Sequence, residues 1–216
     1  DSVRQVVFSP DGNILYTSSS DGSIGVISMG KLEGRLAGAH PVPINSLMHI
    51  ENNAILASGD DDGLLKIWDL RLSANGKQGC VMQFNEHEGT IMDMKMNDQN
   101  NMLLTSANDG HLGVFDLRMN KLYAMSDNFE EDLTALVICK YQKKVLVSSG
   151  KGIINIFSWD WFGDCKDRIV GHPNSIDTMI KYDEDTVITG GEDGLIRAVS
   201  VLPNKIIAIL SDLSLI

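Results

Sequence analysis

The 216-residue sequence predicts an all-β protein built from one repeated unit, and three observations carry this prediction. Five turns that end in glycine separate apolar runs, and their glycines lie 41, 47, 42 and 42 residues apart. After each turn comes a run that ends on an aromatic residue or its replacement. No segment longer than a turn shows helical periodicity. A period near forty residues is typical of repeat architectures. The turns are Ser20-Asp21-Gly22, Asp61-Asp62-Gly63, Asn108-Asp109-Gly110, Gly150-Lys151-Gly152 and Glu192-Asp193-Gly194.

The unit at residues 40–84 shows the expected order of strands. Its third run alternates apolar and polar residues, which is typical of a β-strand. Gly63 supplies the positive φ that a tight hairpin turn demands. A loose loop at 72–77 accounts for the longest of the four spacings. We expect strands at 43–49, 54–58, 64–70 and 80–84.

The other units follow the same course along a single domain, residues 1–216. Four antiparallel strands in about 42 residues make one blade of a β-propeller. The expected repeats are 3–37, 40–84, 87–125, 132–170 and 172–210.

Composition and charge narrow the classes of function. The chain is 43% hydrophobic and 22% charged, with a net charge of −11. Because an acidic surface repels phosphate, direct binding of nucleic acid is disfavoured. No stretch approaches the roughly 20 apolar residues of a membrane span. The three cysteines form no Cys-x-x-Cys pair, so we expect reduced thiols and no zinc. No pattern indicates a cofactor.

A set of polar residues recurs around the turns, and with it the repeats resemble WD40 units. In that family a His, a Ser, an Asp and a Trp form a hydrogen-bonded chain that locks strand to turn. Phe115 and Val199 stand where the Trp is expected, so these blades should depend more on apolar packing. The resemblance implies the structural role for His40, Ser58, Asp62, Trp68, His87, Ser106, Asp109, His172 and Asp193.

The resemblance spans residues 3–210, and runs such as 39–47 and 196–205 are similar to a nucleolar branch of the WD40 family. It implies a non-catalytic scaffold, located in the nucleus and nucleolus, with the cytoplasm as a further location. Its implied partners are ribosome-assembly proteins, and its implied role is to support ribosomal RNA synthesis and processing. WD40 rings typically close with seven blades, which at this period need about 295 residues. We therefore expect five blades of a seven-bladed ring.

Two chemical interpretations of the turns are weaker than the structural one. Asp60-Asp61-Asp62-Gly63 begins like a calcium loop, but the twelfth position, where a Glu is needed, is Arg71. A catalytic Ser-His-Asp triad is disfavoured because the sequence has no Gly-x-Ser-x-Gly elbow. The histidines also recur at equivalent positions of the repeats, which their structural role already explains. We expect neither a metal site nor catalysis.

An alternative function comes from the ends of the third strands. Trp-Asp-Leu-Arg at 68–71 resembles the box by which substrate receptors dock on the damaged-DNA-binding adaptor of cullin-RING ubiquitin ligases, and 115–118 is a weaker copy. The guanidinium of an arginine can bind a carboxylate of an acidic partner through two hydrogen bonds. The competing interpretation is that each arginine closes its own blade. The contact residues would be Asp69, Arg71, Asp116 and Arg118.

Loops on a rigid scaffold are where binding usually takes place, so we predict a partner rim around the turns. It combines residues that precede the turn Asp with residues that enter the inner strands. Two aromatics in the loop after 153–159 join it as hot-spot candidates, although burial against the neighbouring blade competes with exposure. The predicted rim is Pro43, Asp61, Thr90, Asn108, Ser175, Glu192, Trp161 and Phe162.

Overall fold

A computed structural model describes residues 2–50, 55–73, 79–99 and 101–212 as five four-stranded antiparallel sheets, which confirms the predicted fold class. Neighbouring strands in each sheet follow one another along the chain. One turn of helix, α1 (Leu70–Ser73), follows β7. No helix of the described residues is long and apolar enough to cross a membrane. The sheets are β1 (Val3–Phe8), β2 (Ile14–Ser19), β3 (Ile24–Ser28) and β4 (Lys31–Leu36); β5 (Ile44–Ile50), β6 (Ile55–Asp60), β7 (Leu65–Asp69) and β8 (Cys80–Phe84); β9 (Ile91–Met96), β10 (Met102–Ala107), β11 (Leu112–Asp116) and β12 (Lys121–Met125); β13 (Leu133–Cys139), β14 (Lys144–Ser149), β15 (Ile154–Ser158) and β16 (Asp167–Ile169); and β17 (Ile176–Lys181), β18 (Thr186–Gly191), β19 (Leu195–Ser200) and β20 (Lys205–Asp212).

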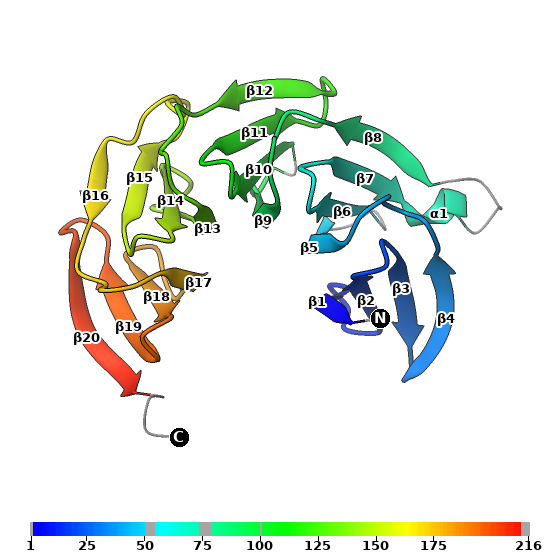
Figure 1. The fold of residues 1–216 in the computed structure, drawn as a ribbon, viewed down its shortest axis with the longest axis horizontal. Coiled ribbons are helices and arrows are strands. Elements are labelled where there is room, and N and C mark those ends of the chain that lie inside the picture. The colour runs from blue at the N-terminus through cyan, green and yellow to red at the C-terminus, as the bar shows by residue number, and fades with distance from the viewer. Residues whose placement is uncertain (1, 51–54, 74–78, 100, 213–216) are drawn as a thin grey trace.

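The sheets stand side by side as the blades of an open arc (Figure 1). The first strand of each blade, β1, β5, β9, β13 or β17, lies toward the centre, and the fourth strand lies outside. β1 and β17 stand at the two ends of the arc, and the described strands do not close into a ring. The seven-bladed ring therefore stays a prediction.

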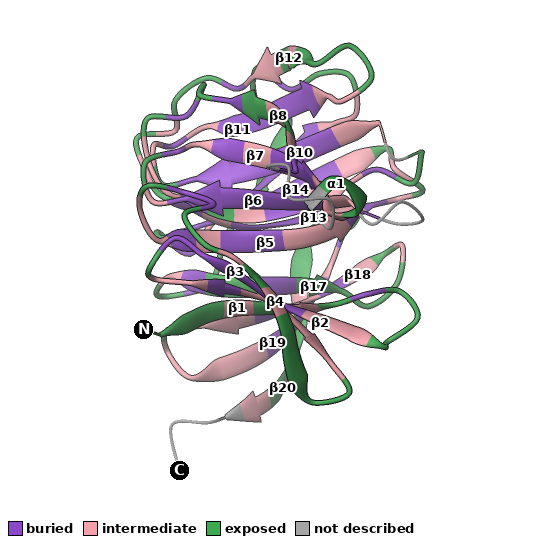
Figure 2. Cartoon of the chain, turned by 90° about the vertical axis from the view of Figure 1, so that its right-hand side faces the viewer, coloured by how far each residue is buried: buried purple, intermediate pink, exposed green. Residues whose placement is uncertain are grey.

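The hydrophobic core lies between blades rather than within one sheet. One cluster joins Leu65 and Ile67 of the second blade to Ile91, Met94 and Phe115 of the third. Burial of this kind stabilises the fold by about 25 cal/mol per Å² of apolar surface. Figure 2 shows the buried residues concentrated in the inner and middle strands. Gly59 permits the close approach, because a Cβ there would lie 2.6 Å from the Cβ of Ile91.

Hydrogen bonds between inner strands link each blade to the next. In every link a side chain of one inner strand reaches a backbone group of the following inner strand. Each such bond contributes about 0.5–1.5 kcal/mol net and fixes how the blades sit together. The links are Gln5 to the N–H of Leu47, Asn45 to the carbonyl of Ile91, Asp93 to the N–H of Leu136 and Thr134 to the carbonyl of Ile176.

The first blade leaves apolar side chains in solvent. Val6 pairs with Thr17 as Leu47 pairs with Ser58 and Met94 pairs with Thr105, so the three share one register position. Leu47 and Met94 pack against the preceding blade and are each 2% exposed. Val6 is 49% exposed, since no described blade precedes it.

Candidate interaction surface

The second blade contains the hydrogen-bonded chain that the repeats predict, with a different carboxylate. His40 Nδ1 lies 2.7 Å from Asp60 Oδ2, and His40 Nε2 lies 2.6 Å from Ser58 Oγ. Trp68 Nε1 donates to Ser58 Oγ at 2.7 Å. The bonds are mutually consistent when Ser58 donates to Nε2 and Nδ1 donates to Asp60. The chain is buried, so it stabilises the blade and offers no reactive group to solvent.

The assignment of Asp62 to this chain was wrong by two residues. Asp62 is exposed, whereas Asp60 ends β6 fully buried. Asp60 Oδ1 also accepts the N–H groups of Asp62 and Leu64, at 3.1 and 2.9 Å. The Asp60 carboxylate therefore accepts the N–H groups of the turn and orients the His40 imidazole. Asp62 takes no part in the hydrogen-bonded chain.

In the third blade the assignment of Asp109 fits the structure and that of Ser106 does not. His87 Nδ1 lies 2.9 Å from Asp109 Oδ2, and His87 Nε2 lies 2.7 Å from Thr105 Oγ1. Side chains alternate across a strand, so Ser106 projects to the opposite face from Thr105. Burial alone would raise the pKa of Asp109, but the hydrogen bond and charge of His87 lower it below its ordinary value. Phe115 occupies the position of Trp68 and is fully buried.

In the fifth blade His172 and Asp193 do not meet. His172 Nε2 lies 2.9 Å from Thr189 Oγ1, and Asp193 instead binds Arg197 through both carboxylate oxygens. Burial lowers the pKa of His172, and the charge of Arg197 adds to this effect. The hydrogen bond from Arg197 lowers the pKa of Asp193. Arginine thus replaces histidine as the partner of the turn carboxylate.

The hydroxyl partners of the three histidines share one position relative to the turn glycine. Ser58, Thr105 and Thr189 each precede a turn glycine by five residues, whereas Ser106 precedes its glycine by four. The missed partners Asp60 and Arg197 carry no comparable signal, because either could be a solvated strand end.

The remaining histidines and the buried cysteine serve local structure. His49 stacks on Tyr16 with ring centroids 5.5 Å apart, and His111 Nδ1 lies 2.8 Å from the carbonyl of Ser126. Burial raises the pKa of Cys139 to about 11, so its thiol is unreactive at neutral pH.

The six predicted rim residues outside the aromatic pair come together as three bonded pairs on one face. The N–H of Asp61 donates to the carbonyl of Pro43 at 3.0 Å. The equivalent bonds in the third and fifth blades join Asn108 to Thr90 at 3.1 Å and Glu192 to Ser175 at 3.0 Å. We call this face, which holds the second-to-third-strand turns and the loops that lead into the next blade, the turn face. Its segments are 20–23, 61–64, 108–111, 150–153 and 192–194, with 37–43, 85–90, 126–132 and 170–175.

The aromatic pair does not belong to this rim. Trp161 and Phe162 follow β15, at the opposite end of that strand from the turn. Phe162 is 3% exposed and packs against Trp159 and Tyr123, so it presents no surface to a partner. Trp161 is 64% exposed, with Lys166 Nζ 5.8 Å from its ring centroid. Only Trp161 remains a surface candidate.

The adaptor-box residues lie at equivalent ends of β7 and β11. Arg71 is exposed, and its guanidinium binds both carboxylate oxygens of Asp69, at 2.9 and 2.6 Å. Asp116 Oδ1 accepts the backbone N–H groups of Arg118 and Met119. The carboxylates therefore hold their own chain ends, and both arginines are exposed.

Together the meander blades, the interblade core and the His–Ser–Asp–Trp chain of the second blade define a WD40-repeat protein. A model of the WDR55 family matches residues 1–215. The chain is 41% identical over 208 residues to the WD repeat-containing protein 55 of Rattus norvegicus, covering 95% of this chain and 53% of that protein.

Plant and fungal relatives are also similar. The WD repeat-containing protein 55 of Arabidopsis thaliana is 38% identical over 210 residues, covering 96% of this chain and 58% of the relative. The WD repeat-containing protein JIP5 of Cryptococcus neoformans is 36% identical over 176 residues, covering 80% and 46%. The chain spans about half the length of the curated relatives it matches. It belongs to the WDR55 family.

Proposed function

We propose that the protein is a non-catalytic interaction scaffold of the nucleus and nucleolus. It assembles ribosome-assembly proteins and so supports ribosomal RNA synthesis and processing. The observation that carries this proposal is the match to the WDR55 family along residues 1–215. The nucleolar role is our extension from the resemblance of the sequence to that branch of WD40 proteins.

The geometry supports binding rather than chemistry. His40, Ser58 and Asp60 are buried in a bonded chain, so a hydrolytic triad would have to dismantle the blade. The loops of the turn face, in contrast, are exposed on a rigid scaffold, which is the usual place for partner binding.

Affinity purification with mass spectrometry, combined with imaging of the tagged full-length protein, tests the proposal. We expect ribosome-assembly factors among the recovered proteins and a nucleolar signal. Exclusion from the nucleolus, together with the absence of such factors, would contradict it.

A substrate-receptor function on a cullin-RING ligase is the second candidate. The observation in its favour is that Arg71 and Arg118 are exposed at the same ends of neighbouring blades. The double variant Arg71→Ala/Arg118→Ala should then lose the adaptor in a pull-down. Retention of ribosome-assembly factors by this variant, with no adaptor bound to either protein, would favour the scaffold alone.

A further inference from the structure

Nearly all the charged residues in the loops of the turn face are acidic. Its only lysine or arginine in the described loops is Lys151, whose Nζ donates to the carbonyl of Glu130. The loops at the other strand ends mix signs and include Arg71, Arg118, Lys140 and Lys143. The acidic residues of the turn face are Asp21, Asp61, Asp62, Glu86, Glu88, Asp109, Asp127, Glu130, Glu131, Asp132, Glu192 and Asp193.

Most of these carboxylates form no ion pair with a described residue. The four with partners are Asp21, Asp61, Asp109 and Asp193, which bind Arg35, Arg4, His87 and Arg197. The others concentrate in 85–90 and 126–132, which lead into the third and fourth blades. One oxygen of Glu131 is buried without a hydrogen-bond partner among the described residues, and Arg168, whose guanidinium lies over the Phe129 ring at 5.8 Å, interacts with Glu131 through charge alone. Crowded, unpaired carboxylates favour a cationic partner.

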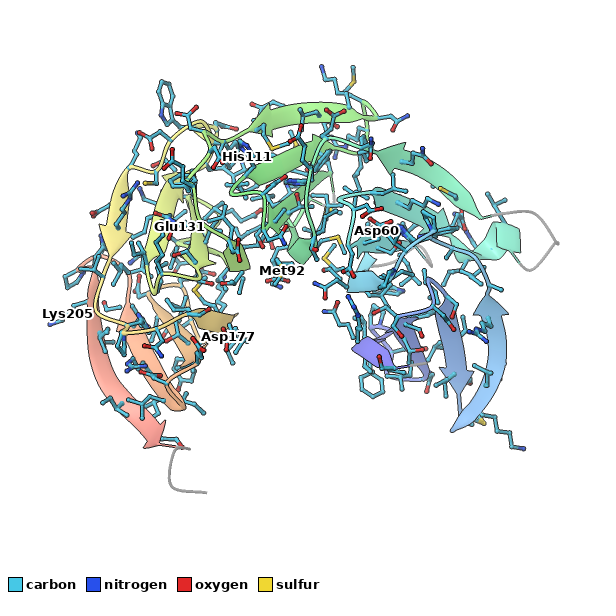
Figure 3. All side chains as sticks on the ribbon, in the orientation of Figure 1. Asp60, Met92, His111, Glu131, Asp177 and Lys205 are labelled. Carbon is cyan, nitrogen blue, oxygen red and sulfur yellow. The ribbon has the colours of Figure 1, made fainter. Side chains whose placement is uncertain are left out.

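A cleft of about 200 Å³ opens between these two loops, lined by Glu86, Glu88, Asp109, His111, Met125 and Asn128. Small-molecule pockets are typically about 300–1,000 Å³, so this cleft suits one extended side chain better than a cofactor. Figure 3 marks His111 at its wall, on the outer part of the arc.

The walls of the cleft are fixed before any partner arrives. Asp109 Oδ2 accepts the N–H of Glu88 at 2.9 Å, and Asn128 Nδ2 donates to the carbonyl of Asp109 at 3.1 Å. A Cβ on Gly89 would lie 2.2 Å from Asn108 Oδ1, so the loop is tightly seated on the turn. The carboxylates of Glu86 and Glu88 are exposed and accept no hydrogen bond from another described residue. A preformed site loses little conformational entropy on binding.

The larger cavity, about 520 Å³ between the inner strands, is a weaker candidate. Asp93 there is already paired with Lys95 at 2.7 Å, and Lys181 with Glu184. Both lysines of this cavity are therefore neutralised, and its other carboxylates, Asp98 and Asp177, accept hydrogen bonds from Gln142 and Ser175.

We propose that the turn face binds a lysine- and arginine-rich segment of another protein, with one cationic side chain in the cleft beside Glu86 and Glu88. This rests on the proposed scaffold function and names the chemistry of its partner. A nucleic acid is disfavoured at the same face, because its phosphates meet carboxylates.

Fluorescence anisotropy of the full-length protein tests the proposal. The probe is a fluorescein-labelled peptide of alternating lysine and serine, and an alternating glutamate–serine peptide is the control. The variant Glu86→Gln/Glu88→Gln/Glu130→Gln removes three exposed charges from the turn face. The matched variant Glu33→Gln/Asp160→Asn/Asp183→Asn removes three exposed charges elsewhere.

We expect the lysine peptide to bind, the turn-face variant to bind about tenfold more weakly, and the matched variant to bind like wild type. Added salt should weaken binding. No binding by wild type, or equal losses in both variants, would overturn the proposal. Circular dichroism confirms that the variants fold, and Glu88→Lys alone should reproduce the loss if the triple variant does not.

The proposed function can fail separately. Ribosome-assembly factors recovered with wild type and with a turn-face variant that no longer binds the peptide would overturn this inference alone. Peptide binding without any such factors would overturn the scaffold function alone.

Discussion

Asp60 and Asp62 are identical in chemistry and differ only in placement, so the pair tests the buried chain of the second blade. Asn at position 60 would place an amide donor against either the Nδ1–H of His40 or the N–H groups of Asp62 and Leu64, and we expect a loss of about 2 kcal/mol in the free energy of unfolding. Asp62→Asn should change it by no more than about 0.5 kcal/mol, since Asp62 is exposed. Urea unfolding of both variants measures the difference. Equal effects would return the role to Asp62.

The buried imidazole of His172 should make stability depend on pH. Its pKa in the folded protein is lowered below the ordinary value of 6.5. The unfolded chain therefore binds a proton at this histidine more readily than the folded protein does. The free energy of unfolding should decrease as the pH falls below about 6.5. His172→Gln should flatten this part of the pH dependence, measured by urea unfolding at a series of pH values. An unchanged slope would contradict the burial argument.

The sequence predicts the strands but not every hydrogen-bond partner around the turns. The period and the turn glycines predict five units, because runs of alternating apolar and polar residues that are bounded by glycine are typical of β-strands. Ser106 is the residue that the sequence predicts, but Thr105 makes the bond, because a shift of one residue moves a side chain to the opposite face of the strand. Burial of Phe162 depends on Tyr123 of the neighbouring blade, which no local pattern encodes. The one-sided charge of the turn face becomes visible only once the loops are assigned to strand ends.

The links between inner strands should hold adjacent blades together. Thr134 Oγ1 donates to the carbonyl of Ile176 and lies 2.9 Å from Ser148 Oγ. Thr134→Val keeps the shape but removes both bonds, and we expect a loss of about 1–2 kcal/mol. Thr178→Val, on the next inner strand but exposed, is the control and should cost no more than about 0.5 kcal/mol. Thermal unfolding compares them, and equal losses would contradict a linking role.

The predicted seven-bladed ring requires that another blade covers the first one. Val6 is the natural reporter, because Leu47 and Met94 are buried at its register position. In the full-length protein, Val6→Cys should react slowly with a thiol reagent, and Met29→Cys, at a position 96% exposed, should react fast. Site-resolved mass spectrometry gives the two rates. Similar rates would contradict closure of the ring over β1.

The proposed partner of the turn face is a basic segment of another protein. Zero-length carbodiimide cross-linking of affinity-purified complexes tests this proposal most directly, because the reagent joins a carboxylate only to an amine in contact with it. We predict cross-links from Glu86, Glu88 or Glu130 to lysines of ribosome-assembly factors. Cross-links confined to Glu33, Asp160 or Asp183, or complexes that form none on the turn face, would contradict the proposal.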